Sequence, residues 1–340
     1  ESTNRAEIKK SIIQNNIYGV DIEKGAVDIA RLRFWLSIVV DEDTPSPLPN
    51  LDYKIMQGNS LIESFQGLDL SELTYKRESK KDSGEVMLFD DEKNRLQKTV
   101  SQLLSTYYSC CDHDKKVRLQ QQISDTIRQQ LEAQFVNSSI LKDLKDVDFT
   151  GNNQFFLWHT WFSDVFNREN GKDGFDIVIG NPPYIKELGN EKVFAPVINS
   201  SFGKKYHAGK MDYWYYFLHK SIEAVHKSGI ISFITSRYWI NSAGAKKIIK
   251  HVSEETNFLN IVDIGKLKVF DNVVGYHMIS ILTKDMSRDT CQYFAISDDV
   301  KNIENGIYTS QRVIKREDLF FNNEIVLENR IASNTIQILG

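Results

Sequence analysis

The sequence has few cysteines and no long apolar run, and each scarcity excludes a class of protein. Only 3 of its 340 residues are cysteines, which cannot build a disulfide framework, so we expect a cytoplasmic protein. Two of them, Cys110 and Cys111, are adjacent, a spacing that does not suit a zinc site, so no metal is expected. No apolar run is long enough to span a membrane, and no membrane association is expected.

An excess of basic charge is also lacking, because the formal net charge is −4 at pH 7. A chain with this charge does not attract nucleic acid as a whole, so any nucleic-acid binding must depend on local basic patches. The length favours two or three structural units over a single small domain.

The most informative segment ends a β-branched run with the sequence Asn181-Pro182-Pro183-Tyr184. The run Ile177–Ile179 predicts a buried strand. Two successive prolines cannot donate hydrogen bonds to a sheet and they fix φ, so the chain must leave the sheet in a rigid turn. This turn presents an amide, a carbonyl and an aromatic ring at a strand end, where α/β sheets bind ligands. A plain strand-to-loop turn explains the same four residues equally well when they are considered alone.

Two further polar residues, Asp21 and Asn59, follow predicted strands at 16–20 and 53–56. Alternation of strands and helices predicts an α/β fold with a doubly wound sheet, in which such strand ends converge on one crevice. A carboxylate there can bind the two hydroxyls of a ribose. Two structural roles remain open, because Asp21 can cap the helix predicted at 24–40 and Asn59 can be a turn residue.

Between residues 90 and 144 the sequence becomes polar, with apolar residues at the spacing of amphipathic helices. We predict an antiparallel helix pair inserted into the α/β domain and interpret it as a solvated spacer, with a partner-binding arm as the alternative. After residue 285 the pattern becomes strand-poor and predicts the start of another domain, which the family resemblance described below implies to be a C-terminal target-recognition or connector region. The predicted divisions are therefore 1–65 and 151–285 for the α/β core, 66–150 for the helical insertion, and 286–340.

In their order along the chain, these motifs resemble those of gamma-class DNA adenine-N6 methyltransferases, and above all the bacterial type IIG restriction–modification enzymes. The resemblance implies a Rossmann-like methyltransferase fold, S-adenosylmethionine as the cofactor and double-stranded DNA as the partner. It covers about residues 15–65 and 150–285. The motifs that carry it are Tyr18–Ile22, Gly58–Leu61, Asn181–Tyr184, the helix around Met211–Phe217, and Ser232–Ser236.

The resemblance also implies a role for individual residues. Asn181 and the Pro182 carbonyl would bind the amino group of an adenine flipped out of the DNA, and Tyr184 would stack on that base. The loop 270–276 would close the target pocket from its other face. The implied cofactor-binding residues are Asp21, Ile22, Asn59 and Asp212. The implied phosphate contacts are Lys204, Lys205 and Lys210, for which an ordinary solvated surface is the alternative.

The sequence departs from this family in one place, because the glycine-rich cofactor loop expected before Asp21 is absent. We therefore expect that the first strand, this loop and an N-terminal segment of the parent chain are missing, and that the fragment is inactive alone. Two other hypotheses stay open. One is a protein-glutamine or RNA amino methyltransferase that uses the same turn, and the other is a non-catalytic DNA-binding module on a methyltransferase scaffold.

Overall fold

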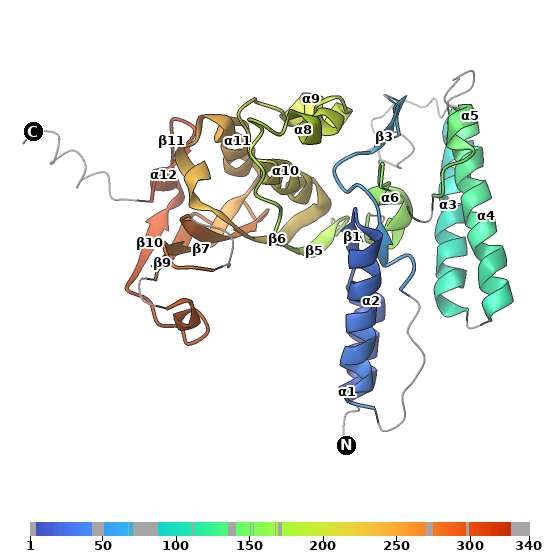
Figure 1. Ribbon diagram of the computed structural model, residues 1–340, viewed down its shortest axis with the longest axis horizontal. Helices are drawn as coiled ribbons and strands as arrows, with labels where there is room; N and C mark the ends of the chain where they lie inside the picture. The colour runs from blue at the N-terminus through green and yellow to red at the C-terminus, as the bar shows by residue number, and fades with distance from the viewer. Residues whose placement is uncertain are drawn as a thin grey trace, which may run out of the picture. The chain divides into compact units, whose positions relative to one another are not determined.

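The computed structural model of the chain forms two compact units, residues 1–167 and 168–340, which are taken one at a time (Figure 1). Among the helices that the structure describes, none is both long and apolar enough to cross a membrane. The described residues are 5–42, 51–66, 68–70, 88–110, 112–134, 141–149, 151, 153–166, 168, 172–269, 275–296 and 299–327.

The first unit begins with two helices and a pair of short parallel strands. Strands β1 and β2 pair in register from Gly19 opposite Ile55 to Asp21 opposite Gln57. The apolar faces of α1 and α2 pack together over this pair, where Val27 is among the buried residues. The elements are α1 (Arg5–Asn16), β1 (Gly19–Asp21), α2 (Lys24–Val39), β2 (Ile55–Gln57), β3 (Ser64–Phe65), β4 (Leu68–Asp69), α3 (Leu88–Ser109), α4 (His113–Gln134), α5 (Leu141–Leu144), α6 (Trp158–Trp161) and α7 (Ser163–Phe166).

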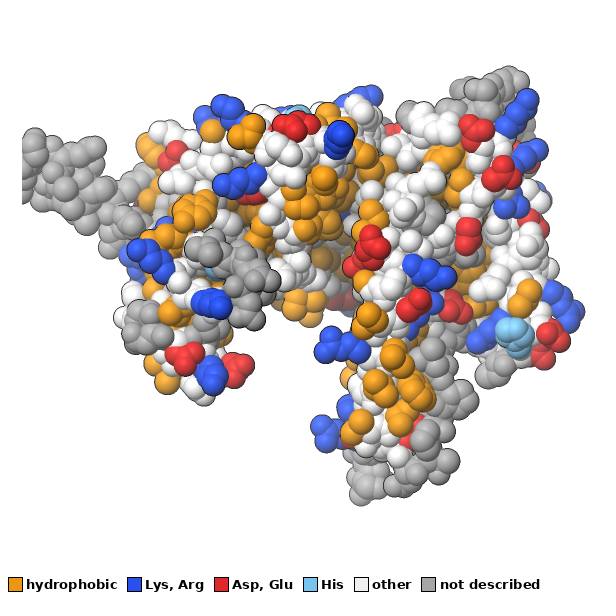
Figure 2. Space-filling view, in the orientation of Figure 1, with side chains coloured by type: hydrophobic (Ala, Val, Ile, Leu, Met, Phe, Trp, Pro, Cys, Tyr) orange, Lys and Arg blue, Asp and Glu red, His pale blue; other side chains and the backbone are white. Residues whose placement is uncertain are grey.

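Helix α2 also carries apolar side chains on its outer surface. Ile29, Leu32 and Leu36 are spaced three and four residues apart and are exposed, so they form one stripe along the helix. Figure 2 shows apolar side chains gathered on this part of the first unit. The helix is therefore apolar on more than the face that packs against α1.

Helices α3 and α4 pack side by side in antiparallel orientation. Gln130 near the end of α4 donates to Gln97 near the start of α3 (3.1 Å), and Gln120 donates to the Tyr107 hydroxyl near the end of α3 (3.1 Å). Tyr107 also donates to Asp52 (2.5 Å) and its ring packs edge-on against Tyr53. Helix α3 thus contributes to the core of the first unit, which a purely solvated spacer would not do.

The second unit is built on a six-stranded mixed sheet with the strand order β10-β9-β7-β8-β6-β5. Pairs β5–β6 and β7–β9 are parallel, and β8 is antiparallel to both neighbours. The elements are β5 (Phe175–Gly180), α8 (Glu191–Ile198), α9 (Ser201–Tyr206), α10 (Trp214–Ala224), β6 (Val225–Ser236), the 3-10 helices η2 (Arg237–Asn241), η3 (Ala243–Ala245) and η4 (Val300–Asn302), α11 (Lys246–Glu255), β7 (Asn257–Gly265), β8 (His277–Thr283), β9 (Thr290–Ala295), β10 (Ser310–Lys315), α12 (Arg316–Leu319), β11 (Phe320–Phe321) and β12 (Glu324–Ile325).

The predicted α/β class is confirmed, but the sheets differ from one doubly wound sheet. Strands β1 and β2 form a two-stranded sheet of their own, apart from the six-stranded sheet. Strand β5 is an edge strand, and Ile177 and Ile179 on one of its faces are 63% and 81% exposed. The prediction of a buried strand is therefore wrong for this face, because a β-branched run favours a strand but does not determine which of its faces other elements cover.

Two local predictions in the second unit are also wrong. The dipeptide Ser228-Gly229, whose residue types predict a turn, lies inside β6, where the pairing register with β5 shifts. Gly229 permits this irregularity, because a Cβ atom there would lie 2.8 Å from the Phe175 carbonyl oxygen. The region after residue 285, expected to be strand-poor, adds β9 and β10 to the main sheet.

Candidate functional site

The turn after β5 places its polar groups at the carboxyl end of the sheet. Asn181 is exposed, and within the described residues its side-chain amide makes no hydrogen bond. Pro182 is buried and anchors the turn. Gly180, the last residue of β5, must be a glycine, because a Cβ atom at this position would lie 2.9 Å from the Phe233 ring of the neighbouring strand. The backbone at Asn181 is therefore held in place, and its exposed amide oxygen is open to accept hydrogen bonds.

Tyr184 is fixed by both ends of its side chain. Its hydroxyl donates to the Ile234 carbonyl oxygen in β6 (2.8 Å), and its ring lies 6.0 Å from the His277 ring at an angle of 34°. Burial raises the pKa of Tyr184 to about 12, so the hydroxyl keeps its proton and donates at neutral pH. The ring is only half buried, which leaves part of it for contact with a flat ligand.

Asp212 lies beside the segment that follows this turn. Residues Lys186 and Asp212 form an antiparallel bridge, supported by hydrogen bonds from Tyr213 N to Ile185 O (2.7 Å) and from Glu187 N to Met211 O (2.9 Å). Burial raises the pKa of the Asp212 carboxyl group, although Lys186 opposes this effect. The structure therefore brings this predicted cofactor residue close to the Asn181–Tyr184 turn.

A network of three side chains holds this bridge in place. Glu187 accepts a hydrogen bond from the Met211 amide (3.1 Å), and its other oxygen lies 3.3 Å from Nε2 of His207. Nδ1 of His207 in turn lies 2.8 Å from the Tyr216 hydroxyl. Burial raises the pKa of Tyr216 above its ordinary value, so this hydroxyl remains a donor. Sequence reasoning missed Glu187 and His207, which are 20 positions apart and share no motif.

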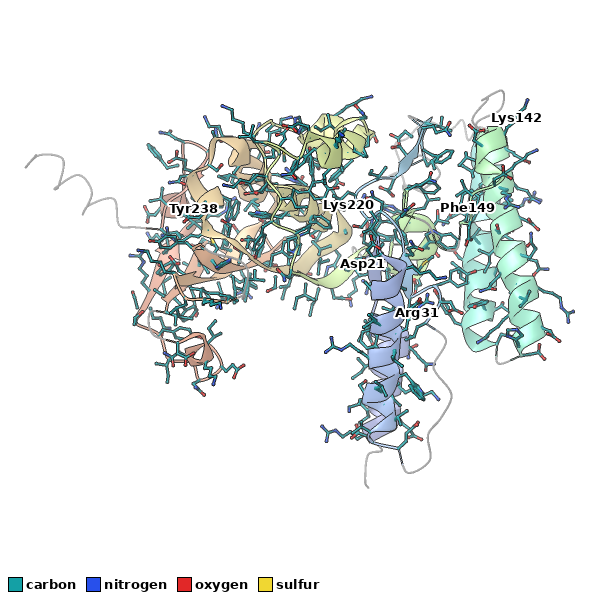
Figure 3. The ribbon with its side chains drawn as sticks, in the orientation of Figure 1. Asp21, Arg31, Lys142, Phe149, Lys220 and Tyr238 are labelled. Carbon is teal, nitrogen blue, oxygen red and sulfur yellow. The ribbon has the colours of Figure 1, made fainter. Side chains whose placement is uncertain are left out.

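The other predicted cofactor residues lie together at the carboxyl end of the β1–β2 pair in the first unit. The Asp21 carboxylate accepts a hydrogen bond from the Glu23 amide (2.8 Å), and the Asp21 carbonyl accepts one from Gly58 N (2.9 Å). Asn59 Oδ1 accepts a hydrogen bond from Leu61 N (3.2 Å). Ile22 is exposed beside Asp21, whose position at the junction of β1 and α2 is labelled in Figure 3. Asp21 keeps its second carboxylate oxygen for a ligand.

The three predicted phosphate contacts differ in their surroundings. Lys204 and Lys210 are exposed, whereas the ammonium group of Lys205 lies 2.8 Å from Glu223. Lys210 has a left-handed backbone (φ 54°), and its carbonyl oxygen lies so near Gly244 that a Cβ atom there would be only 2.0 Å away. Lys204 and Lys210 are therefore better placed for phosphate than Lys205.

Residues 270–274 of the loop expected to close the target pocket lie outside the described residues. Cys111, one of the two adjacent cysteines for which no zinc site is expected, also lies outside them. Within the parts of the chain that the structure describes, no group of three His, Cys, Asp or Glu side chains is arranged to hold a metal ion.

Comparison with known proteins gives a family match over most of the chain. The model of the Eco57I restriction-modification methylase family matches residues 15–270. The putative type II restriction enzyme and methyltransferase RM.MjaORFECS2P of Methanocaldococcus jannaschii is 27% identical in an alignment 222 residues long that covers 52% of this chain and 18% of that protein. RM.Eco57I of Escherichia coli, a type II restriction enzyme and methyltransferase, is 25% identical over 36% of this chain and 12% of its own length.

The type II methyltransferase M.HincII of Haemophilus influenzae is 27% identical over 40% of this chain and 29% of its own length. The chain thus spans less than a third of each of these curated relatives. Among solved structures, the ATP-dependent type ISP restriction-modification enzyme LlaBIII bound to DNA aligns with 95% of this chain and 18% of its own, at 14% identity and a TM-score of 0.45.

Proposed function

Because the chain belongs to the Eco57I restriction-modification methylase family, we propose that it transfers a methyl group from S-adenosylmethionine to the N6 amino group of a flipped adenine in DNA. The observation that carries this proposal is the Asn181–Tyr184 turn. An amide oxygen with no partner among the described residues lies in the same rigid turn as a half-buried aromatic ring.

The residues of this turn suit the nucleophile. The amino group of adenine is a poor nucleophile because its lone pair is delocalised into the ring. Two acceptors, the Asn181 side-chain oxygen and the Pro182 carbonyl, would bind its two hydrogens and localise that lone pair. Positioned acceptors then supply most of the catalysis, and no strong base is needed.

The ring of Tyr184 suits a base that has left the duplex. An extrahelical base loses its stacking energy, and contact with an aromatic ring restores part of it. Since the Tyr184 hydroxyl is bonded to the Ile234 carbonyl, the ring orientation is set before any base arrives. This preorganisation lowers the entropic cost of binding.

The polar groups of the first unit suit the nucleoside part of S-adenosylmethionine. Asp21 has a free carboxylate oxygen for the ribose hydroxyls, Ile22 presents an exposed apolar surface for the adenine ring, and Asn59 can contact its amino group. In the second unit, Asp212 lies beside the Asn181–Tyr184 turn and is a further residue that the family resemblance assigns to the cofactor. When bound, S-adenosylmethionine supplies an electrophilic methyl group on a positively charged sulfur.

The test is Asn181→Ala in the complete protein, with tritiated S-adenosylmethionine and duplex DNA. Removing one acceptor at the reacting group is expected to lower methyl transfer by about 100-fold or more, with DNA affinity within a few fold. The exposed Asn305→Ala is the matched control. The methylated nucleoside is identified by mass spectrometry. Full activity of Asn181→Ala contradicts the proposed role, and a product other than N6-methyladenine contradicts the proposed substrate.

A further inference from the structure

A second aromatic cluster lies at the carboxyl end of strand β6 and includes Tyr276, the last residue of the loop 270–276, but no step of the methyl transfer described above uses its rings. The ring of Tyr238 packs edge-on against Tyr276, with centroids 5.8 Å apart and an angle of 79°. The ammonium group of Lys266 lies 5.5 Å from the centre of the Tyr276 ring. We call Tyr238, Tyr276 and Lys266 the tyrosine platform.

The sheet register places the platform next to the Asn181–Tyr184 turn. Ser236, two residues before Tyr238, pairs with His277, and His277 also pairs with Gly265 at the end of β7. The ring of His277 is the one that contacts Tyr184. Tyr238 and Tyr276 are therefore chain neighbours of residues that border the proposed target site, and yet they form a ring pair of their own.

The Tyr238 ring is exposed and packs against the Tyr276 ring. It is 57% exposed, and Figure 3 labels it on the second unit. An edge-to-face pair covers at most one face of a ring, so the part of the chain that the structure describes leaves the rest of the Tyr238 ring open. Gly275 keeps it open, because its φ of +144° disfavours any side chain, and a Cβ atom there would lie 3.5 Å from the Tyr238 ring.

The backbone under the platform is fixed by an ion pair. The Arg237 amide donates to the Tyr276 carbonyl (2.8 Å), and the Arg237 side chain donates to Asp263 (2.7 Å). The Tyr293 hydroxyl also donates to Asp263 (3.0 Å). Asp263 is buried and its negative charge is compensated by Arg237, so it does not repel a phosphate. Lys266 is exposed, and its positive charge attracts a phosphate.

An open aromatic face with a neighbouring cation is the combination that binds single-stranded nucleic acid. We infer that the tyrosine platform stacks on an unpaired nucleobase of a DNA strand, at a site distinct from Tyr184. The inference rests on the proposed function, because a DNA with one base extruded exposes unpaired bases near the reacting one. The platform would then hold a second nucleotide of the opened site.

The first experiment locates the contact directly. A single-stranded oligonucleotide that contains 5-iododeoxyuridine is irradiated with the complete protein, and cross-linked peptides are identified by mass spectrometry. We expect a cross-link at Tyr238 or Tyr276 that disappears in Tyr238→Ala. Cross-links confined to other residues would overturn the inference.

The second experiment measures affinity with a fluorescent oligothymidylate. If a base stacks on Tyr238, the affinity of Tyr238→Ala for the oligothymidylate should be about 5- to 100-fold lower than that of the parent protein. The affinity of Tyr238→Phe should stay within about 2-fold of the parent value, because this variant retains the ring. Phe321→Ala is the matched control, since Phe321 is a similarly exposed aromatic residue in β11. Equal affinity of Tyr238→Ala and the control would refute the platform.

The two proposals can fail separately. Asn181→Ala should retain binding of the oligothymidylate, because Asn181 does not belong to the platform. If Tyr238→Ala binds normally while Asn181→Ala abolishes methyl transfer, the platform is rejected and the proposed function stands. If Tyr238→Ala loses binding while Asn181→Ala methylates normally, the platform stands as a DNA-binding site and the proposed reaction is rejected.

Discussion

At the scale of single residues, Tyr184 combines two functions that substitution can separate. Its ring is the proposed stacking surface, and its hydroxyl is the anchor to the Ile234 carbonyl. Removing the hydroxyl alone leaves the ring in place with more freedom, while removing the ring also removes the stacking surface. A variant without the hydroxyl therefore tests the orientation of the ring, and a variant without the ring tests its contact with the base.

We predict that Tyr184→Ala weakens the binding of duplex DNA that carries 2-aminopurine at the target position. The expected decrease in binding free energy is about 1–3 kcal/mol for one base–aromatic contact. Tyr184→Phe should lose no more than about 1 kcal/mol, the contribution of one neutral hydrogen bond. Fluorescence of 2-aminopurine reports base extrusion in both variants. Identical behaviour of the two variants would mean that the ring does not stack on the base.

Glu187 acts through other residues, because its carboxylate ties the Met211 amide to His207 and so positions Asp212 beside the Asn181–Tyr184 turn. We predict that Glu187→Ala lowers kcat for methylation by about 10- to 100-fold, since small displacements of reacting groups have effects of this size. Glu187→Gln keeps an acceptor for the Met211 amide and should retain more activity.

The KM for DNA should stay within about 2-fold in these variants, because Glu187 has no proposed contact with DNA. Glu254→Gln, on the exposed face of α11, is the matched control. A parallel decrease of thermal stability and kcat, without the difference between Ala and Gln, would show that Glu187 only supports folding.

At the scale of elements, two buried histidines join α10 to α11. Nδ1 of His219 lies 2.7 Å from Nδ1 of His251, and both rings stack with Tyr206 of α9. Burial is the main cause that lowers the pKa of His219, to about 2, and the neighbouring His251, Lys205 and Lys247 lower it further. Burial also lowers the pKa of His251, against the opposite effects of Glu255 and Glu223.

These pKa values predict a decrease of stability in acid. Unfolded His219, with an ordinary pKa of 6.5, binds a proton that the folded form rejects, so its stability contribution is complete above pH 6.5 and declines as the pH falls towards 2. We expect the free energy of unfolding to fall by about 1.4 kcal/mol per pH unit below pH 6. Denaturant titrations of His219→Phe should show a smaller slope with pH. The exposed His113→Gln should behave like the parent protein, and an unchanged slope in His219→Phe would contradict the assignment.

Helix α3 provides a second prediction at this scale. The buried rings of Tyr53 and Trp161 stack on each other (5.4 Å), and Tyr107 of α3 packs against Tyr53. Replacing residues 90–144 with a short Gly/Ser linker exposes these rings, at about 1.5–3 kcal/mol for each large side chain. We therefore expect a lower melting temperature and less cooperative unfolding. An unchanged melting curve would restore the interpretation of the helix pair as a solvated spacer.

Elements with a strong local pattern could be predicted, and those defined by pairing could not. Helix α2 begins at Lys24 as predicted, because apolar spacing determines it. The exposure of Ile177 and Ile179 depends on which elements cover that face of β5, and the register shift at Ser228-Gly229 depends on the partner strand. Strands β9 and β10 were missed because their sequences are mixed, and pairing with β7 supplies the stability that local propensity lacks.

The candidate site shows the same division between local and non-local information. Asn181 and Tyr184 follow from a contiguous motif, and their placement at the end of β5 was predictable. The contact between Glu187 and His207 and the pairing of Lys186 with Asp212 join residues that are 20 and 26 positions apart. No periodicity encodes such contacts, because they depend on how α8, α9 and the loops around them pack.

At the scale of the whole molecule, the charge distribution decides how a chain with a net charge of −4 binds a polyanion. The overall field is weakly unfavourable, so affinity must come from phosphate contacts at local cations. In the second unit Lys204 and Lys210 are exposed, while Lys205 is paired with Glu223. The proposed DNA interface should therefore depend on the first two lysines far more than on the third.

We predict that Lys204→Gln and Lys210→Asn each weaken duplex DNA binding uniformly across sequences. The plot of log affinity against log salt should become shallower by about 0.9 for each phosphate that the variant no longer neutralises. Asparagine is chosen at position 210 because it tolerates the left-handed backbone there. Lys205→Gln should change the slope little, because its charge is already compensated by Glu223. Lys142→Gln, on α5 of the first unit (Figure 3), is the control for a general charge effect. Equal slopes for all four variants would place the DNA interface elsewhere on the chain.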